Sequence, residues 1–461
     1  MVEKAKSRLH HLASFCFLGL IILVVLIHIR TTVIITLGIT IYRPSAVGSC
    51  SAWKSKMPPP PPFAVEQWMD SHETSAKYNL AETCCASVSI DELCSLSERA
   101  SAPSAKSLLS TSAIQNYGHI RGNPSLLAHL SRLYSSKVGT PLPSEHILIT
   151  PGAIAANFLT FYALLGPGDH VVCHYPTYQQ LYSVPESLGA EVSLWRSRPE
   201  KEWLPDFDEL QNMCRESTKM IILNNPQNPT GRILPKRLLH KIVDFAEQRN
   251  IIILSDEVYR PLFHGISPID DDFPPSILSL GYKNTIATGS MSKAYSLAGI
   301  RVGWMASRNA EIVEKVASAR HFATISVSLL DQEVAAFALS HDCIHALLGR
   351  NIAMAKANLE LLERFIIKHD EYMSWPAKPV AGTTAFVKFT RDGKAVDSKA
   401  LCERLQERTG VMFLPGDVGF GVEWKGFVRI GYVNRTEIMK AGLDELNRFM
   451  RKDYDDVPLC E

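Results

Sequence analysis

The chain has 461 residues, of which 46% are hydrophobic and 8% aromatic, so it can bury large cores and divide into two or more domains. Its 48 basic and 47 acidic side chains leave a net charge of +1, which provides no strong field for nucleic acid, and we therefore expect small molecules as partners. Ten cysteines without Cys-x-x-Cys spacing do not make a disulfide framework or a metal site, and they indicate a reducing compartment, the cytoplasm, for the globular part.

Residues 1–56 are an N-terminal extension whose apolar runs within residues 12–42 fit a single-pass membrane anchor. An incorrectly assigned upstream start explains the extension equally well. A cleaved signal peptide is the weaker alternative, because the cysteines argue against an oxidising destination. Residues 57–111 begin with Met57 and five prolines, a stiff spacer, and continue as an N-terminal arm from Phe63. A chain that starts at Met57 would keep every candidate site residue described below.

Residues 112–320 alternate helix-like and strand-like segments, and we assign them to a large domain. The segment "GNPSLLAHLSRLY" is typical of a helix, because Asn123 can cap its start and Pro124 suits its first turn. Its apolar residues fall on one predicted face: Leu126, Leu127, Leu130, Leu133 and Tyr134.

Seven short apolar runs in this domain are separated by amphipathic helical patterns: "HILIT", "HVVCH", "EVSLW", "KMIILNN", "IIILSDEVY", "NTIATGS" and "RVGWMAS". Such runs predict an α/β fold with a mainly parallel, seven-stranded sheet that is covered by helices on both faces. Residues 321–461 mix long helices with the strands "TAFVKFT" and "FVRIGYV", which predicts a smaller α+β domain.

Unusual residues follow four of the predicted strands, in "TPGAIAAN", "NNPQNPTG", "SDEVY" and "TGSMSK". Ligands of open parallel sheets bind at the carboxyl ends of the strands. These four strand ends can therefore form one binding site.

The residues after two of these strands suit an aldehyde cofactor that carries a phosphate. Lys293 supplies an amine that can form an imine. Backbone N–H groups at a helix start favour anions, and Gly152 to Ile154 open a helix directly after a strand. Ser290, Ser292 and Arg301 can add further donors to the phosphate.

Two more side chains suit a pyridine ring. A buried carboxylate keeps a ring nitrogen protonated, and this protonation makes the ring an electron sink. Asp256 lies at a strand end that suits this task, and Tyr178 in "YPTYQQLY" can cover the flat ring.

The set "YGHIRG", "NNPQNPTG", "SDEVY", "SMSKAYSLAGIR" and "FVRIG", in this order, resembles the fold-type I pyridoxal-phosphate enzymes of the class I/II aminotransferase family. Each motif alone is weak, but five in register are a strong signal. The resemblance extends from about Phe63 to the end of the chain.

The resemblance implies a role for each residue around the cofactor ring. Lys293 would form a lysine aldimine with pyridoxal 5'-phosphate and then shuttle the Cα proton of the substrate. Asp256 would pair with the pyridinium nitrogen. Asn228 and Tyr259 would hydrogen-bond the phenolic oxygen of the cofactor, and Tyr178 would stack on its ring.

The resemblance also implies a phosphate site and a dimer. Ser290, Arg301 and the amides of Ala153 and Ile154 would hold the phosphate, and Tyr117 of "YGHIRG" would reach over from a second subunit. Because the site would be shared between subunits, the resemblance implies a homodimer.

One further arginine and one departure bear on the substrate. Arg429 would grip the substrate α-carboxylate as a bidentate clamp. Many family members have a glycine-containing segment near the arm, whereas this chain has "YNLAETCCASVSIDEL". Together with residues 152–195, from "GAIAANF" to "EVSLW", this stretch resembles the branch that contains capreomycidine synthase. In this segment, Glu82 and Thr83 either touch the substrate or begin a turn.

Ordinary structural roles are the alternatives for several of these residues. Tyr178 and Tyr259 could pack in the core with satisfied hydroxyl groups, and Arg301 could form an ion pair. For His119 and Arg121, which lie near Tyr117 in sequence, a solvated loop is the favoured interpretation.

Transamination between an L-amino acid and an oxo acid is the first hypothesis for function. A pyridoxal-phosphate-dependent eliminating or cyclising enzyme, or a carbon–sulfur lyase, is the second. A non-catalytic regulator that binds the cofactor is the third, and it is disfavoured because the chain has no basic helix-turn-helix module. No second arginine and no acidic cluster in the sequence indicates the substrate side chain.

Overall fold

The structure is a computed structural model that describes residues 59–97, 104–109, 112, 114–135 and 140–460. Within these ranges no helix has the length and apolar character needed to cross a membrane. The predicted anchor within residues 12–42 lies outside the described residues. The described part belongs to one compact unit, residues 57–461.

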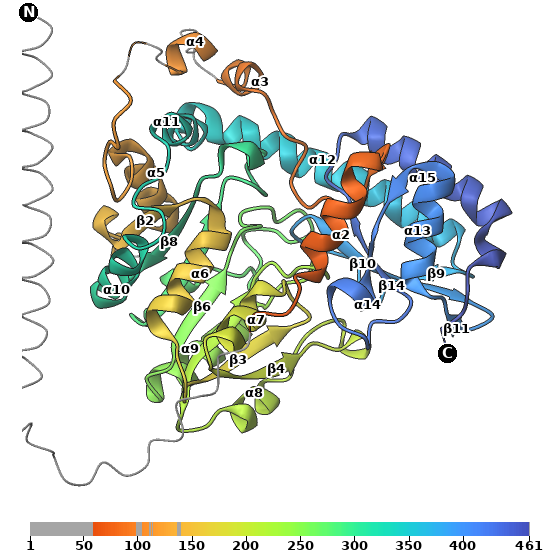
Figure 1. Ribbon diagram of the computed structural model, residues 1–461, viewed down its shortest axis with the longest axis horizontal. Helices are drawn as coiled ribbons and strands as arrows, with labels where there is room; N and C mark the ends of the chain where they lie inside the picture. Colours follow the sequence, from red (N-terminus) through yellow and green to blue (C-terminus); the bar gives the residue numbers. More distant parts are fainter. Residues whose placement is uncertain (1–58, 98–103, 110–111, 113, 136–139, 461) are drawn as a thin grey trace, which may run out of the picture. The chain divides into compact units, whose positions relative to one another are not determined.

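A seven-stranded sheet forms the centre of the large domain (Figure 1). Its strands are β2 (Ile147–Thr150), β3 (His170–Tyr175), β4 (Glu191–Arg196), β5 (Thr218–Asn224), β6 (Ile252–Asp256), β7 (Thr285–Ser290) and β8 (Gly303–Ser307). The order is β2-β8-β7-β6-β5-β3-β4. Only β8 runs antiparallel to its neighbours in this sheet. The prediction of a mainly parallel, seven-stranded sheet is confirmed.

Helices cover both faces of this sheet, because successive strand residues point to opposite sides. On β5, Met220 and Ile222 belong to a core shared with α6 (Gly152–Leu164), α7 (Gln180–Ser187) and α10 (Ala310–Arg320). The alternate residues Ile221 and Leu223 belong to a core shared with α5 (Pro124–Ser135), α8 (Phe207–Met213) and α9 (Lys236–Gln248).

Helix α5 begins as its sequence predicts. Asn123 Oδ1 accepts hydrogen bonds from the N–H groups of Ser125 and Leu126, at 2.9 and 3.2 Å. Leu126, Leu130 and Tyr134 are buried. The expectation for Leu133 is wrong: its side chain is 37% exposed, because the buried stripe of this helix is narrower than the predicted one.

A smaller antiparallel sheet lies in the C-terminal part, in the order β11-β10-β14-β13 with β9 paired to β10. Its strands are β9 (Met373–Ser374), β10 (Thr384–Arg391), β11 (Lys394–Ala395), β13 (Leu414–Pro415) and β14 (Phe427–Gly431). Its helices are α11 (Leu329–Ala338), α12 (His341–Lys368), α13 (Ser398–Thr409), α14 (Gly416–Gly419) and α15 (Thr436–Lys452). The division of the chain at residues 112–320 and 321–461 stays a prediction.

The N-terminal arm contains α2 (Ala64–His72), β1 (Tyr78–Asn79), α3 (Ile90–Ser95) and α4 (Ala105–Leu108). Strand β1 pairs in parallel with β12 (Val411–Met412). Further along, Gly431 donates to the carbonyl of Leu80 at 2.7 Å, and Cys85 donates to the carbonyl of Lys293 at 3.2 Å. The arm therefore runs from the small sheet to the loop after β7.

Candidate active site

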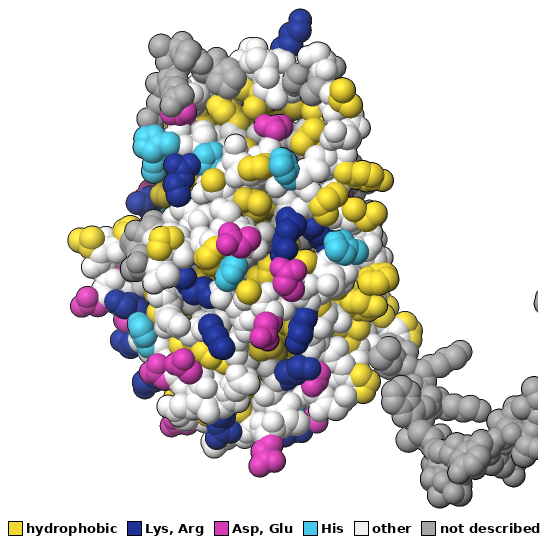
Figure 2. All heavy atoms as spheres, turned by 90° about the vertical axis from the view of Figure 1, so that its left-hand side faces the viewer, with side chains coloured by type: hydrophobic (Ala, Val, Ile, Leu, Met, Phe, Trp, Pro, Cys, Tyr) yellow, Lys and Arg dark blue, Asp and Glu magenta, His cyan; other side chains and the backbone are white. Residues whose placement is uncertain are grey.

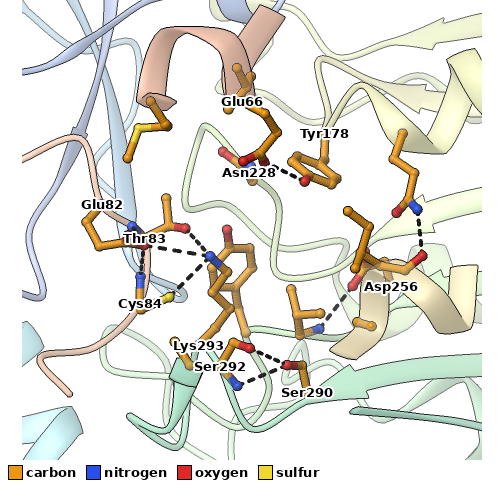
Figure 3. Close-up of a pocket in the computed structure, with 18 of the residues that line it drawn as sticks. Glu66, Glu82, Thr83, Cys84, Tyr178, Asn228, Asp256, Ser290, Ser292 and Lys293 are labelled. Carbon is orange, nitrogen blue, oxygen red and sulfur yellow. Dashed lines mark hydrogen bonds and ion pairs between the residues drawn. The ribbon is translucent and has the colours of Figure 1, made fainter. Parts of the chain in front are cut away.

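One cavity of about 380 Å³ lies at the carboxyl ends of the parallel strands. All residues predicted for the site line this cavity, with the exception of Tyr117. They come from the ends of β5, β6 and β7, the start of α6 and β14, and the arm adds further residues (Figure 3).

Lys293 lies three residues after β7, and its amine meets the arm. Its Nζ donates to Thr83 Oγ1 at 2.6 Å and lies 3.4 Å from Cys84 Sγ and 3.8 Å from Glu82 Oε1 (Figure 3). Burial by itself lowers the pKa of this ammonium, but the acidic side chains around it, led by Cys84 and Glu82, outweigh burial and raise the pKa above its ordinary value.

Glu82 both begins a turn and lines the cavity, so the two roles that the sequence allowed do not exclude each other. Its Oε1 accepts the N–H groups of Thr83 and Cys84 at 2.6 and 2.7 Å, as in a tight turn, while it also faces Lys293 in the cavity. Burial by itself raises the pKa of Glu82, but Lys293 and these N–H groups lower it to about 2. Glu82 is therefore a carboxylate at neutral pH.

Asp256 is the last residue of β6 and is 4% exposed. Its carboxylate accepts hydrogen bonds from Asn157 Nδ2 at 3.1 Å and from the N–H of Val258 at 3.2 Å. Burial raises the pKa of Asp256 to about 6, although both hydrogen bonds oppose this shift. Thr288 donates to Asn157 Oδ1 at 2.8 Å and so fixes the orientation of the amide.

The loop after β5 holds Asn228, which is linked to Asp256 through Asn224. Asn224, the last residue of β5, accepts the N–H of Asn228 at 2.7 Å and donates to the carbonyl of Asp256 at 3.1 Å. Tyr259 is 3% exposed, and burial raises the pKa of its hydroxyl. Both Asn228 and Tyr259 therefore line the cavity in a fixed position.

Tyr178 follows β3 and covers another side of the cavity. Its hydroxyl donates to Glu66 Oε1 at 2.7 Å, and Glu66 lies on α2 (Figure 3). Burial raises the pKa of the Tyr178 hydroxyl. The ring of Phe63, the residue before α2, lies 4.9 Å from the ring of Tyr178. The arm therefore holds the ring of Tyr178 in place.

The start of α6 is open toward the cavity. No side chain of the described residues caps this helix, and Ala153 and Ile154 line the cavity. A Cβ on Gly152 would lie 2.8 Å from Arg301 Nη2, and a Cβ on Gly303 would lie 2.5 Å from the N of Ala153. Both glycines therefore permit the close approach of Arg301 and β8 to the helix start.

Ser290 and Ser292 also line the cavity. The N–H of Ser292 donates to Ser290 Oγ at 2.9 Å, and Ser290 Oγ donates to Ser292 Oγ at 2.8 Å. Arg301 Nη1 donates to Ser292 Oγ at 3.3 Å and to the carbonyl of Ala298 at 2.9 Å. A guanidinium, two hydroxyl groups and a helix start thus surround one end of the cavity.

Arg429 lies in the middle of β14 and is 3% exposed. Its Nη2 donates to the carbonyl of Ala81 at 2.8 Å, and its Nη1 donates to Asn228 Oδ1 at 3.4 Å. Its Nε has no hydrogen-bond partner among the described residues. Burial lowers the pKa of Arg429. A buried guanidinium that lines the cavity is suited to an anionic group of a ligand.

The loop residues before α5 lie apart from the cavity. Tyr117 is 68% exposed and does not line the cavity of its own chain. Arg121 forms an exposed ion pair with Glu314 at 2.9 Å, and His119 is exposed. A contribution of Tyr117 to the site of a second subunit stays a prediction.

Several cavity residues escaped the sequence analysis. Asn157 lies one helical turn after Ala153 on α6, so the helical period could have indicated it. Glu66, Asp70 and Glu73 belong to the arm, and no motif marks them. Folding brings these three carboxylates and Glu82 to one cavity, and the sequence did not indicate this grouping.

The family model described as Aminotransferase class I and II matches residues 90–442. The chain therefore belongs to the class I and II aminotransferase family, whose enzymes depend on pyridoxal phosphate, and it is an enzyme of this type.

Among known proteins, the chain is 29% identical to capreomycidine synthase of Streptomyces vinaceus, over 83% of this chain and 92% of that protein. The structure of a PLP-dependent aminotransferase from Streptococcus suis matches with a TM-score of 0.76 and 37% identity, over 85% of this chain and 98% of that one. The structure of the PLP-dependent cyclase OrfR matches with a TM-score of 0.74 and 25% identity, over 89% of this chain and 99% of that one.

Proposed function

We propose that the cavity binds pyridoxal 5'-phosphate and that the enzyme transfers an amino group between an L-amino acid and an oxo acid. One observation carries this proposal: a partly buried amine, Lys293, and a buried carboxylate, Asp256, line the same cavity as the uncapped start of α6. These three features match the aldehyde, the ring nitrogen and the phosphate of the cofactor.

The phosphate fits the end of the cavity at α6. The N–H groups of Ala153 and Ile154 lie in the first turn of this helix, where the helix dipole favours an anion. Arg301 adds a positive charge, and Ser290 and Ser292 add hydroxyl donors.

When bound, pyridoxal phosphate supplies an aldehyde and an electron-withdrawing ring that stabilises negative charge at the substrate Cα. Asp256 holds a proton on the ring nitrogen, and Asn157 orients its carboxylate. Asn228 and Tyr259 would hydrogen-bond the phenolic oxygen, and Tyr178 would cover the ring face.

Two residues act on the amino acid itself. Arg429 would bind the α-carboxylate, because it is a buried guanidinium that lines the cavity. Lys293 would accept the proton that leaves the substrate Cα, because its amine lines the same cavity. The atom that next receives a proton then decides between transamination and elimination.

The test is to purify the full chain and look for a visible absorbance that borohydride removes. The peptide that carries the reduced cofactor must contain Lys293. The purified enzyme must also convert an amino acid and an oxo acid into the exchanged pair. A protein that binds no pyridoxal phosphate, or that carries it on another lysine, contradicts the proposal.

An eliminating or cyclising reaction is the second candidate. The segment of Glu82, Thr83 and Cys84 contacts Lys293 Nζ, so it can influence where a proton goes after the Cα proton has left. The likeness to capreomycidine synthase and to the cyclase OrfR also favours this candidate. Release of ammonia or of a cyclic product, without oxo acid, would support it over transamination.

We infer that the enzyme is a homodimer. Ile154, Phe158 and Tyr162 are 41%, 45% and 54% exposed and form an apolar stripe with a spacing of four residues on α6. Figure 2 shows the face that lies on the left of Figure 1, and hydrophobic side chains gather along one edge of this face. Sedimentation should give a dimer for the native protein and a monomer for Phe158→Glu.

A further inference from the structure

The arm presents three consecutive side chains to the amine of Lys293, and Thr83 is the middle one. Thr83 Oγ1 lies 2.6 Å from Nζ, whereas Cys84 Sγ and Glu82 Oε1 lie 3.4 and 3.8 Å away (Figure 3). Thr83 therefore makes the shortest of these three contacts. It is only 5% exposed, so little water competes for this hydrogen bond.

The backbone of the arm keeps the Thr83 hydroxyl beside the amine. The N–H groups of Thr83 and Cys84 both donate to Glu82 Oε1, at 2.6 and 2.7 Å, which closes a tight turn. The next residue, Cys85, donates its N–H to the carbonyl of Lys293 at 3.2 Å. The chain around Thr83 is thus bonded directly to the backbone of the residue whose amine it contacts.

The two neighbouring side chains are poorer partners for this amine. Glu82 Oε1 already accepts two N–H groups, and a carboxylate can only accept hydrogen bonds, so Glu82 favours the ammonium form of Lys293. Burial raises the pKa of the Cys84 thiol to about 11, so this group is a neutral thiol near pH 7 and a weak hydrogen-bond partner. A hydroxyl differs from both, because it accepts from an ammonium and donates to a neutral amine.

A second contact connects Thr83 to Tyr259. Burial raises the pKa of the Tyr259 hydroxyl, and the charges of Lys293 and Arg429 and a hydrogen bond with Thr83 oppose this rise. The proposed function places the Tyr259 hydroxyl at the phenolic oxygen of the cofactor. Thr83 therefore lies between two groups of the cavity, the amine and this hydroxyl, that both have a role in the proposed function.

We propose that Thr83 is a positioning residue for Lys293: its hydroxyl holds the amine in both of its charge states while Lys293 carries the Cα proton. This inference rests on the proposed function, in which Lys293 gains a proton from the substrate and gives it up again. In the ammonium form Nζ donates to Thr83 Oγ1. In the amine form the same hydroxyl can turn and donate to Nζ.

Two substitutions at Thr83 isolate the contribution of the hydroxyl. Thr83→Val keeps nearly the shape of the side chain but has no hydroxyl, whereas Thr83→Ser keeps the hydroxyl. Thr140→Val is the matched control, because Thr140 is exposed and does not line the cavity. Circular dichroism compares the fold of each variant with that of the native protein.

The first measurement follows the capture of pyridoxal phosphate by the cofactor-free protein as a function of pH. Only the neutral amine attacks an aldehyde, so the rate rises with pH until Lys293 has lost its proton. In Thr83→Val the ammonium loses its nearest acceptor, and this loss affects the neutral amine less. We expect the profile to move to lower pH, with capture near pH 7 about three- to tenfold faster. Thr83→Ser and Thr140→Val should keep the native profile.

The second measurement follows the exchange of the Cα proton for deuterium in D2O, without an oxo acid. Its probe is the amino acid that the native enzyme converts in the test of the proposed function. We expect exchange in Thr83→Val to be at least about tenfold slower, because an amine that is not held in place transfers a proton less efficiently. Thr83→Ser should exchange within about threefold of the native rate.

The combination of the two results separates a positioning role from a general disturbance of the cavity. Faster capture together with slower exchange in Thr83→Val supports the inference. A native exchange rate or a native capture profile in this variant would overturn it. Slower capture together with slower exchange, or a Thr83→Ser protein no better than Thr83→Val, would also overturn it. A native protein that binds no cofactor at Lys293 contradicts the proposed function itself.

Discussion

The large sheet and the N-terminal arm both line the cavity, but they hold their side chains in different ways. Asp256 ends a strand whose register is fixed on both sides, opposite Asn224 on β5 and Thr288 on β7. The arm has only the two-residue strand β1 and is otherwise held by individual hydrogen bonds, such as that from Gly431 to Leu80, and by buried side chains such as Trp68.

This difference separates two kinds of task. A strand end within a sheet keeps its position because many backbone hydrogen bonds fix the strand. Such a position suits side chains that must hold a cofactor. The arm depends on a few close approaches, which suits a region that adapts the same site to a particular substrate. Changes in the two regions should therefore have different consequences.

The largest expected effect is at the sheet side. Lys293→Ala removes the amine that binds the cofactor and moves the Cα proton, so we expect turnover to fall by at least about 10⁴-fold. The rate of oxo acid formation measures this loss. Lys283→Ala, an exposed lysine before β7, is the control and should keep the native rate. A Lys293→Ala enzyme that forms oxo acid at the native rate would show that Lys293 is not the catalytic lysine.

Asp256→Asn should reduce turnover by about 10²- to 10³-fold, because an amide cannot hold a proton on the ring nitrogen. The pKa of Asp256 is about 6 in the protein. As the pH falls through this value, the carboxylate gains a proton and loses the charge that pairs with a protonated ring.

Cofactor affinity of the native, cofactor-free protein should therefore fall below about pH 6, by up to about tenfold per pH unit. Titrations of both proteins across this range measure the effect. This part of the pH dependence should be missing in Asp256→Asn, and identical profiles would show that Asp256 does not face the ring nitrogen.

Gly431→Ala tests the close approach of the arm. A Cβ at this position would clash with the carbonyl oxygen of Glu82, and we expect a loss of about 3 kcal/mol in the free energy of unfolding. Gly349→Ala is the matched control, because no heavy atom lies within 4 Å of its added Cβ in helix α12. It should stabilise the protein by about 0.5–1 kcal/mol. Denaturant unfolding distinguishes the two, and equal stabilities would contradict the packing at Gly431.

Glu82→Gln has the smallest expected effect. The amide can still accept the N–H groups of the turn, but the negative charge 3.8 Å from Lys293 Nζ is lost. The pKa of Lys293 then falls, so more of the neutral amine is present at neutral pH. We expect the cofactor-free protein to capture pyridoxal phosphate about two- to fivefold faster, since Glu82 is partly exposed. A slower or unchanged rate would show that Glu82 does not act through its charge.

The sequence indicated much of the fold because its local signals agree with the tertiary structure. The seven apolar runs became the seven strands of the large sheet, and Asn123 caps α5. Leu133 was placed wrongly because the helical period alone does not reveal how wide a stripe its neighbours cover.

The candidate residues at strand ends could be predicted for the same reason. Asp256 ends an apolar strand, and Lys293 and Asn228 follow apolar strands within three and four residues. Parallel strands bring their carboxyl ends to one edge. Glu66, Asp70 and Glu73 could not be predicted, because α2 reaches the cavity through contacts with residues far away in the sequence. The hydrogen bond between Glu66 and Tyr178, 112 positions apart, is one example.

The sequence by itself determined the class of the enzyme, the order of its strands along the chain and the residues suited to hold a cofactor, because these depend on local patterns and on short motifs. Only the tertiary structure decided which charges surround the substrate. Glu66 of α2 and Arg429 of β14 line one cavity because long-range packing positions the arm, and the local sequence of the arm carries no information about that packing.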